Sequence, residues 1–128
     1  MIRGIGTDIV YIPRILGILQ KYGERFLNRI YTEQEIEISR KYNSQEMQAR
    51  YFAKRFAAKE AFVKALGSGR GITMKGIEIY SDVRGKPYIA VKKDFILKIH
   101  LSLSDDGDYA TAFVIICGYS CTNDQKGL

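Results

Sequence analysis

The chain has 128 residues, 46% of them apolar, and a formal net charge of +6. This length suits one domain with a real hydrophobic core, expected at residues 1–120, followed by a polar tail at 121–128. No apolar run reaches the roughly 20 residues that cross a bilayer, and charged residues interrupt any signal-peptide segment. The sequence therefore predicts a cytoplasmic protein without a membrane partner. Its positive charge indicates acidic or phosphorylated partners.

The first half is predicted to begin with a short strand and to continue as helices. The strand covers 1–6, where Gly4 and Gly6 would let another backbone or a ligand approach closely. Asp8 is expected where this strand gives way to a helix. Pro13 suits the first turn of that helix. The apolar stripe of the helix is Ile12, Ile15, Leu16 and Leu19.

Further helical segments follow before the middle of the chain. A short helical turn is expected at 26–30. Thr32 and Glu35 form a capping box, which predicts a helix that starts near residue 33. The longest helix is predicted at 45–66, with Gly67 as its C-cap.

The second half changes to the two-residue period of strands. A hairpin is predicted around a turn at 84–87, and a turn at 105–108 precedes a central strand that is apolar on both faces. Residues 93–97 are expected to connect two strands. The expected strands are 77–80, 88–92, 99–104 and 109–118. The prediction is an α+β fold, with helices mainly in the first half packed on an antiparallel sheet that the first strand joins.

The cysteines and the histidine do not indicate a metal or redox site. Cys117 and Cys121 lack the spacing of a zinc or redox motif, so a buried strand residue and a free thiol are expected. His100 is the lone histidine, and we expect neither a histidine metal site nor a Ser-His-Asp triad around it.

The long helix carries the most informative residues. Glu60 and Lys64 are four residues apart and share one face. Phe56 and Val63 bracket Glu60, so its carboxylate lies near the apolar stripe, where a charge needs a partner. A Gly-rich basic loop follows at 67–71. One interpretation is an exposed ion pair worth roughly 0.2–0.5 kcal/mol. The other is a site for a magnesium-bound phosphate, which needs a second acidic residue.

Three features have both a structural and a functional interpretation. Asp8 either supplies the second carboxylate of a magnesium site or caps the helix that follows it. Arg14 is either an ordinary exposed arginine or a contact for an acidic partner. The loop at 67–71 is either a helix C-cap with a turn, or a segment whose three glycines let a ligand approach.

Taken together, the motifs resemble those of the holo-acyl-carrier-protein synthases, a family of 4'-phosphopantetheinyl transferases. The resemblance covers nearly the whole chain, residues 1–116, in the family's order. It rests most on Gly4–Ile9, which contains Asp8, and on the helix motif Arg55–Phe62 followed by Lys64. The other matching positions are Arg14, Gly67–Gly71, Gly85–Tyr88, His100–Ser104 and Tyr109–Ala110.

The resemblance implies a reaction. The family transfers the 4'-phosphopantetheine arm of coenzyme A to a serine of apo-acyl carrier protein, with Mg²⁺, and releases adenosine 3',5'-bisphosphate. It also implies a cytoplasmic enzyme of fatty acid biosynthesis, a homotrimer with sites between neighbouring subunits, and no nucleic-acid partner.

The resemblance also implies roles for individual residues. Asp8 and Glu60 are the expected metal ligands, and Glu60 and Lys64 the expected catalytic residues. Lys64 would meet the phosphates and protonate the leaving group. Either Glu60 or a metal-bound water would accept the proton of the serine. Arg14 would dock the acyl carrier protein. The expected coenzyme A contacts are Arg55, Lys64, Gly67, Ser68 and Gly69.

One position departs from the family pattern. Members commonly carry His after the serine that ends the penultimate strand, whereas this chain has Asp105 after Ser104. An aspartate would repel phosphate and would more naturally accept hydrogen bonds from ribose or amide groups. No catalytic role is therefore predicted for Asp105, and the acidic cluster at 105–108 is also consistent with a solvated turn.

Two other functions stay open from the residues alone. A small basic nucleic-acid-binding module would account for the charge and the nine tyrosines. It lacks a helix-turn-helix signature or an RNP-type strand, and it leaves Asp8 and Glu60 unexplained. The other is a homologue that binds coenzyme A or carrier protein without turnover, and the presence of Asp8, Glu60 and Lys64 argues against it.

Overall fold

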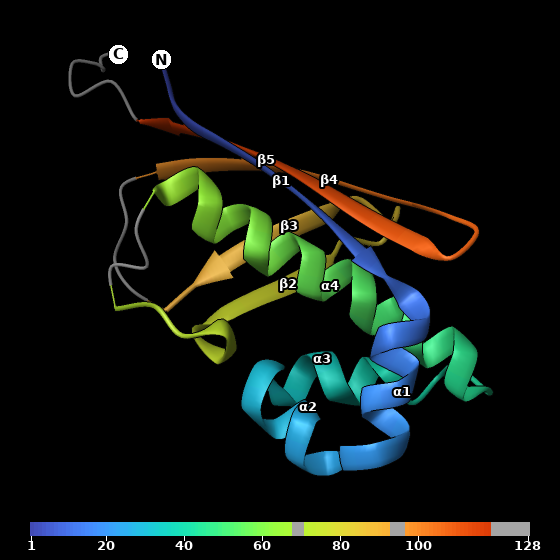
Figure 1. Ribbon diagram of the computed structural model, residues 1–128. Helices are drawn as coiled ribbons and strands as arrows, with labels where there is room; N and C mark the ends of the chain where they lie inside the picture. The colour runs from blue at the N-terminus through green and yellow to red at the C-terminus, as the bar shows by residue number, and fades with distance from the viewer. Residues whose placement is uncertain (68–70, 93–96, 119–128) are drawn as a thin grey trace.

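The computed structural model describes residues 1–67, 71–92 and 97–118 and has the α+β architecture that the sequence predicts (Figure 1). The helices of this part are α1 (Ile12–Tyr22), α2 (Glu24–Ile30), α3 (Glu33–Ser39), α4 (Gln45–Leu66) and the short 3-10 helix η1 (Met74–Gly76). Its strands are β1 (Ile2–Tyr11), β2 (Ile77–Ser81), β3 (Pro87–Val91), β4 (Leu97–Asp106) and β5 (Tyr109–Gly118).

The described strands form two antiparallel sheets. β5 lies between β1 and β4, while β2 and β3 pair as a separate hairpin. The predictions that β5 is central and that the first strand joins its sheet are therefore confirmed. The expectation of one sheet was wrong, because the hairpin forms a second one. Figure 1 shows α4 between the two sheets, and the helix contacts both.

β1 is longer than the sequence predicted. The strand was expected to end at Gly6, but it continues to Tyr11 and remains paired with β5 as far as Tyr109. Asp8 therefore lies inside the strand, opposite Ala112, and not at a strand–helix junction. It does not cap α1, whose N-cap is Tyr11. The glycines obscured this strand, because they interrupt the alternating apolar pattern that marks one.

The helix boundaries agree closely with their local signals. Pro13 lies in the first turn of α1, and both hydrogen bonds of the capping box between Thr32 and Glu35 are formed. α4 begins after Ser44, whose hydroxyl accepts a backbone N–H of the first turn. It ends at Gly67, which has a φ of 84°, the left-handed conformation that glycine adopts most readily.

Two smaller expectations were wrong. β4 continues through Asp106, so the turn before β5 consists of Gly107 and Asp108 and not of 105–108. Cys117 is half-buried in β5 and not fully buried. The predicted features outside the described residues are most of the connector at 93–97, Cys121 and the tail at 121–128.

The hydrophobic core gathers around α4. The buried face of this helix is rich in alanine, and small side chains let a helix lie close to its neighbours. The buried alanines are Ala49, Ala53, Ala57, Ala58, Ala61 and Ala65. Phe52 and Phe62 fill the larger spaces beside them. In the described part of the chain, no helix has the length and apolar character needed to cross a membrane.

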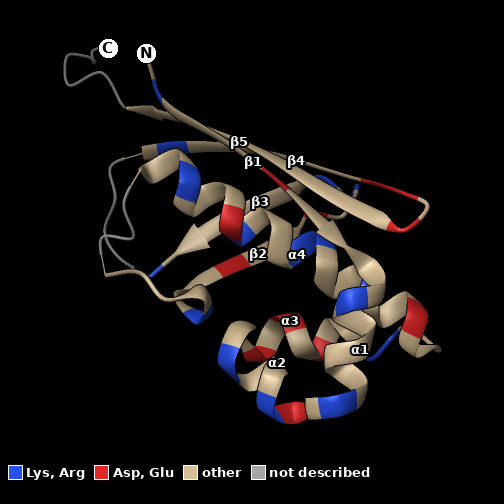
Figure 2. Cartoon of the chain, in the orientation of Figure 1, with Lys and Arg blue, Asp and Glu red and all other residues tan. Residues whose placement is uncertain are grey.

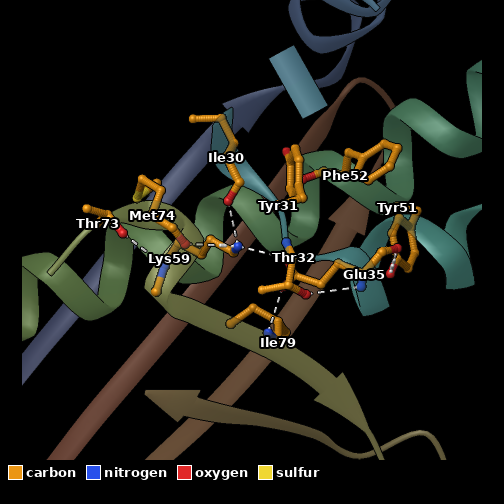
Figure 3. A network of polar contacts seen from close by, with 11 residues as sticks. Ile30, Tyr31, Thr32, Glu35, Tyr51, Phe52, Lys59, Thr73, Met74 and Ile79 are labelled. Carbon is orange, nitrogen blue, oxygen red and sulfur yellow. Dashed lines mark hydrogen bonds and ion pairs between the residues drawn. The ribbon is translucent and has the colours of Figure 1, made fainter. Parts of the chain in front are cut away.

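A buried ion pair joins α4 to α3 and the hairpin. Lys59 Nζ lies 2.7 Å from Glu35 Oε1, and both side chains are fully buried (Figure 3). Lys59 also donates hydrogen bonds to the carbonyl oxygens of Ile30, at 2.8 Å, and Met74, at 3.1 Å. Glu35 Oε2 accepts the backbone N–H of Ile79 at 2.7 Å. Burial lowers the pKa of Lys59, and the Glu35 carboxylate opposes that shift.

Candidate active site

The site begins with a close approach of β1 to α4. A Cβ atom on Gly4 would collide with the carbonyl oxygen of Ala65, and one on Gly6 would collide with that of Ala61. Of the two possibilities that the sequence left open for these glycines, close approach of another backbone is therefore the one observed. The strand lies directly on the helix backbone because neither glycine has a side chain.

Asp8 is the next residue on the same face of β1, since alternate residues of a strand face the same side. Its side chain is only 16% exposed, and Asp8 Oδ1 lies 3.0 Å from Lys64 Nζ. The ammonium also donates to the carbonyl oxygen of Thr7 at 3.0 Å. Long helical side chains lean toward the N-terminus of their helix. This lean carries Lys64 back along α4 to the aspartate.

Asp8 and Glu60 line one cavity of about 350 Å³. Arg14 from α1 and Phe56 from α4 also line it, and Glu60 itself is half-buried. Among the described residues, the ion-pair partner of Lys64 is Asp8 and not Glu60, so the simple i, i+4 surface pair is not formed. The structure thus brings four of the predicted site residues together: Asp8, Arg14, Glu60 and Lys64.

The donors in this cavity are hard oxygen atoms. Two carboxylates from different elements suit Mg²⁺, which prefers oxygen ligands and keeps several waters. A set of three or more His, Cys, Asp or Glu residues able to hold a metal is not found in the described ranges. A metal here would therefore depend on Asp8, Glu60 and oxygens of a substrate, which is the donor set that the sequence predicted.

A second cavity adjoins the first along α1 and α2. It has a volume of about 660 Å³ and shares Ile18 and Phe26 with the first cavity. Its other lining residues are Tyr22, Arg25, Asn28 and Arg29. Figure 2 shows basic residues on both of these helices. This basic and aromatic surface was not predicted from the sequence. The available signal was Arg25 and Arg29, which are four residues apart on α2 and so share a helix face.

Arg55 does not line the cavity of Asp8 and Glu60. It is five residues from Glu60, about 140° around the helix, and it lines a cavity of about 490 Å³ between α3, α4 and the β2–β3 hairpin. Its guanidinium carbon lies 3.9 Å from the ring centroid of Tyr51. Its Nε is buried and has no hydrogen-bond partner among the described residues. A buried donor without a partner calls for an explanation, and a bound anion near the guanidinium would be one.

The remaining predicted contacts belong to the loop after α4. Gly67 is the exposed C-cap of the helix, which is the structural interpretation of that glycine. Ser68 and Gly69 lie outside the described residues. Their predicted contacts with coenzyme A stay predictions.

An α+β domain with paired carboxylates, an adjacent lysine and a cavity that contains a buried arginine has the parts of a phosphate-handling enzyme. A family profile described as the 4'-phosphopantetheinyl transferase superfamily matches residues 4–114. The chain therefore belongs to this superfamily and is an enzyme, as the sequence resemblance predicted.

Individual relatives agree with the family match. A holo-[acyl-carrier-protein] synthase of Wolbachia pipientis wMel is 86% identical over 120 residues, which cover 94% of this chain and 98% of that protein. The fold is similar to that of a Bacillus anthracis holo-(acyl-carrier-protein) synthase in complex with CoA (3',5'-ADP). The TM-score is 0.82 and the identity 35%, with 92% of this chain and 98% of that chain covered. A Helicobacter pylori synthase in complex with coenzyme A has a TM-score of 0.77 at 30% identity, covering 88% and 99%.

The glycine contact predicts the effect of adding one methyl group. Gly6→Ala should force β1 away from α4 and lower the free energy of unfolding by about 1–3 kcal/mol, as overpacking usually does. Gly17→Ala is the matched control, because a Cβ there meets nothing within 4 Å and lies on a helix. It should raise stability by up to about 1 kcal/mol. Urea unfolding measures both, and equal stability of the two variants would contradict the close approach.

Proposed function

We propose that this enzyme transfers the 4'-phosphopantetheine group of coenzyme A to a serine of apo-acyl carrier protein and releases adenosine 3',5'-bisphosphate. The observation that carries the proposal is one cavity lined by Asp8 and Glu60, with Lys64 paired to Asp8 at 3.0 Å. The names of the similar synthases support the same reaction. The family match favours this reaction over a nucleic-acid-binding module. Such a module would also leave the two carboxylates unexplained.

Magnesium is the proposed metal, and Asp8 and Glu60 would hold it. When bound, it would neutralise part of the negative charge that builds on the pyrophosphate oxygens during transfer. Lys64 would add a positive charge beside those oxygens and would give a proton to the leaving group. Either Glu60 or a metal-bound water would accept the proton that the serine hydroxyl loses, and the water is favoured because a metal-bound carboxylate is a poorer base.

Coenzyme A is the proposed co-substrate, with contacts from Arg55, Lys64, Gly67, Ser68 and Gly69. The position of Arg55 bears on how one ligand reaches all of them. Because Arg55 and Glu60 line different cavities of one chain, a site completed by a neighbouring subunit is the simpler arrangement. This supports the homotrimer with sites between subunits that the family resemblance implies.

The outer face of the larger sheet is suited to such an interface. Alternate residues of β1 and β5 on this face expose large apolar side chains, whereas the opposite face packs on α4. The exposed side chains include Ile5, Ile9, Tyr109 and Phe113, with exposed fractions of 45% to 63%. We place the contact between subunits on this face, and we propose the cytoplasm and fatty acid biosynthesis as the setting of the enzyme.

Acyl carrier protein is the proposed second substrate, and its docking surface begins at Arg14. This arginine lines the cavity of the two carboxylates, which adjoins the cavity lined by Arg25 and Arg29. Tyr22 and Phe26 supply apolar contact between these arginines. A basic surface with aromatic residues next to the catalytic carboxylates fits an acidic protein whose serine must enter the site.

The reaction is tested by mass spectrometry of apo-acyl carrier protein incubated with the enzyme, coenzyme A and Mg²⁺. We expect a mass gain of one phosphopantetheine, and EDTA should abolish it. Asp8→Asn and Glu60→Gln should each lower the rate by about 10²–10³-fold, as loss of a charge-stabilising group typically does. Glu37→Gln removes an exposed carboxylate on α3 and should leave the rate unchanged. Full activity of Glu60→Gln would refute its assignment to the site.

The docking surface predicts a selective effect on the carrier protein. Arg14→Ala should raise the KM for acyl carrier protein five- to tenfold, a loss of about 1–1.4 kcal/mol, and should change the KM for coenzyme A little. Arg40→Ala is the matched control, because Arg40 is exposed and its ion-pair partner in the described part of the chain is Glu37 on α3. Steady-state kinetics with each substrate varied gives both values. Equal effects of the two variants would place docking elsewhere.

The proposed subunit interface is tested by a charge on the outer sheet face. Phe113→Lys should dissociate the trimer to monomers and lower transfer, because a lysine ammonium is costly to bury without a partner. Met47 is exposed to a similar extent, at 52% against 45% for Phe113, but lies in the first turn of α4, so Met47→Lys should leave the trimer intact. Sedimentation velocity distinguishes the species. A wild-type monomer that is fully active would rule out the inter-subunit site.

A further inference from the structure

The turn between β4 and β5 is tied to α4 by a cluster of charged side chains. Asp105 Oδ2 accepts a hydrogen bond from Arg50 Nη1 at 2.9 Å, and Asp105 Oδ1 lies 3.3 Å from Lys54 Nζ. Arg50 Nη2 also donates to the carbonyl oxygen of Gly107 at 2.9 Å. Arg50 and Lys54 are four residues apart, so both reach the aspartate from the same face of α4.

Asp105 is more buried and more fully paired than an ordinary surface carboxylate. Its side chain is 26% exposed, and each of its oxygens faces a different cation. Partial burial raises the pKa of Asp105, but the hydrogen bond from Arg50 and the ammonium of Lys54 outweigh burial and hold the pKa below its usual value. Asp105 is therefore ionised at neutral pH. The predicted solvated turn is thus not the whole description of this acidic segment.

Lys54 connects this cluster to the cavity of Arg55. Both residues line that cavity, and Lys41 adds a third basic side chain. Arg55 Nε is the buried donor without a partner among the described residues. Lysine loses much rotamer freedom when it is held in one geometry. A carboxylate that already holds the Lys54 ammonium at the cavity wall would therefore reduce the entropy cost of ordering this side chain when an anionic ligand binds.

We propose that Asp105 is a positioning residue that holds Lys54 at the wall of the Arg55 cavity, where the two basic side chains together contact a phosphate group of coenzyme A. This inference rests on the proposed function for the identity of the anion. Asp105 itself does not touch the ligand. It acts through Lys54, and Arg50 secures the opposite side of the carboxylate.

An effect of charge alone would change the ligand affinity in the opposite direction from an effect of positioning. Removing the negative charge of Asp105 would make the cavity more positive, so a ligand that sensed only charge would bind more tightly without it. Positioning predicts weaker binding instead. The sign of the change in affinity therefore separates the two explanations.

The test is calorimetric binding of coenzyme A and of adenosine 3',5'-bisphosphate to the whole enzyme. Asp105→Asn should weaken both ligands five- to tenfold and raise the KM for coenzyme A, while the KM for acyl carrier protein stays the same. Asp105→Glu should restore most of the affinity, because it returns a carboxylate. Asp106→Asn makes the same change at the next residue, which is exposed, and should have no effect.

Two further variants separate positioning from stability. Arg50→Met removes the bonds to Asp105 and Gly107 but leaves the contact between Lys54 and Asp105, so it should lower the melting temperature and keep most of the coenzyme A affinity. Lys54→Met should weaken coenzyme A binding as much as Asp105→Asn does. The double variant that combines these two changes should bind coenzyme A no more weakly than either single variant. Additive losses would contradict a shared action.

The outcomes are distinct from those of the proposed function. A wild-type enzyme that neither binds coenzyme A nor modifies a carrier protein overturns the function and this inference with it. An active wild type in which Asp105→Asn binds coenzyme A equally well or more tightly overturns the positioning role alone. Weaker binding in Asp105→Asn and Lys54→Met, with rescue by Asp105→Glu, supports it.

Discussion

The contact between β1 and α4 is the constraint on which the site depends. Two residues of a strand rise about 6.8 Å and one turn of a helix about 5.4 Å, so alternate strand residues stay nearly level with successive helix turns. Gly4 meets the turn of Ala65 and Gly6 the turn of Ala61. Asp8 then follows on the same face, where the side chain of Lys64 reaches it by leaning back along α4. The glycines thus place a carboxylate and a lysine from distant parts of the chain within 3.0 Å of each other.

The buried pair of Lys59 and Glu35 holds the other side of the same helix. Moving two charges out of water costs several kcal/mol per ion, and their attraction offsets this only when the remaining hydrogen-bonding groups are satisfied. Here they are, because the pair also binds the last residue of α2, the first residue of η1 and the middle of β2 through backbone carbonyl and N–H groups. An apolar pair of the same size would leave those buried backbone groups without partners. The ion pair therefore organises irregular segments that a hydrophobic contact could not.

Local signals in the sequence predicted most helix boundaries, and long-range contacts account for what they did not. The capping box at Thr32 and the C-cap at Gly67 act within a few residues, so they are readable from the chain. The length of β1 depends on pairing with β5, about a hundred residues away, and its glycines carry no apolar pattern. The burial of Lys59 was missed, although Phe52 and Phe62 lie on the same helix face, at i−7 and i+3. A lysine in line with buried aromatics was the available signal.

α4 carries two kinds of chemistry on two of its faces. One face presents Glu60 and Lys64 toward Asp8, and another presents Arg55 to a separate polar cavity. A short ligand cannot contact both faces of one helix, because the core lies between them. An extended ligand that bridges two subunits can, provided that the subunits meet through the exposed apolar face of β1 and β5. The separation of Glu60 and Arg55 within one chain is therefore the structural reason for the proposal that a neighbouring subunit completes the site.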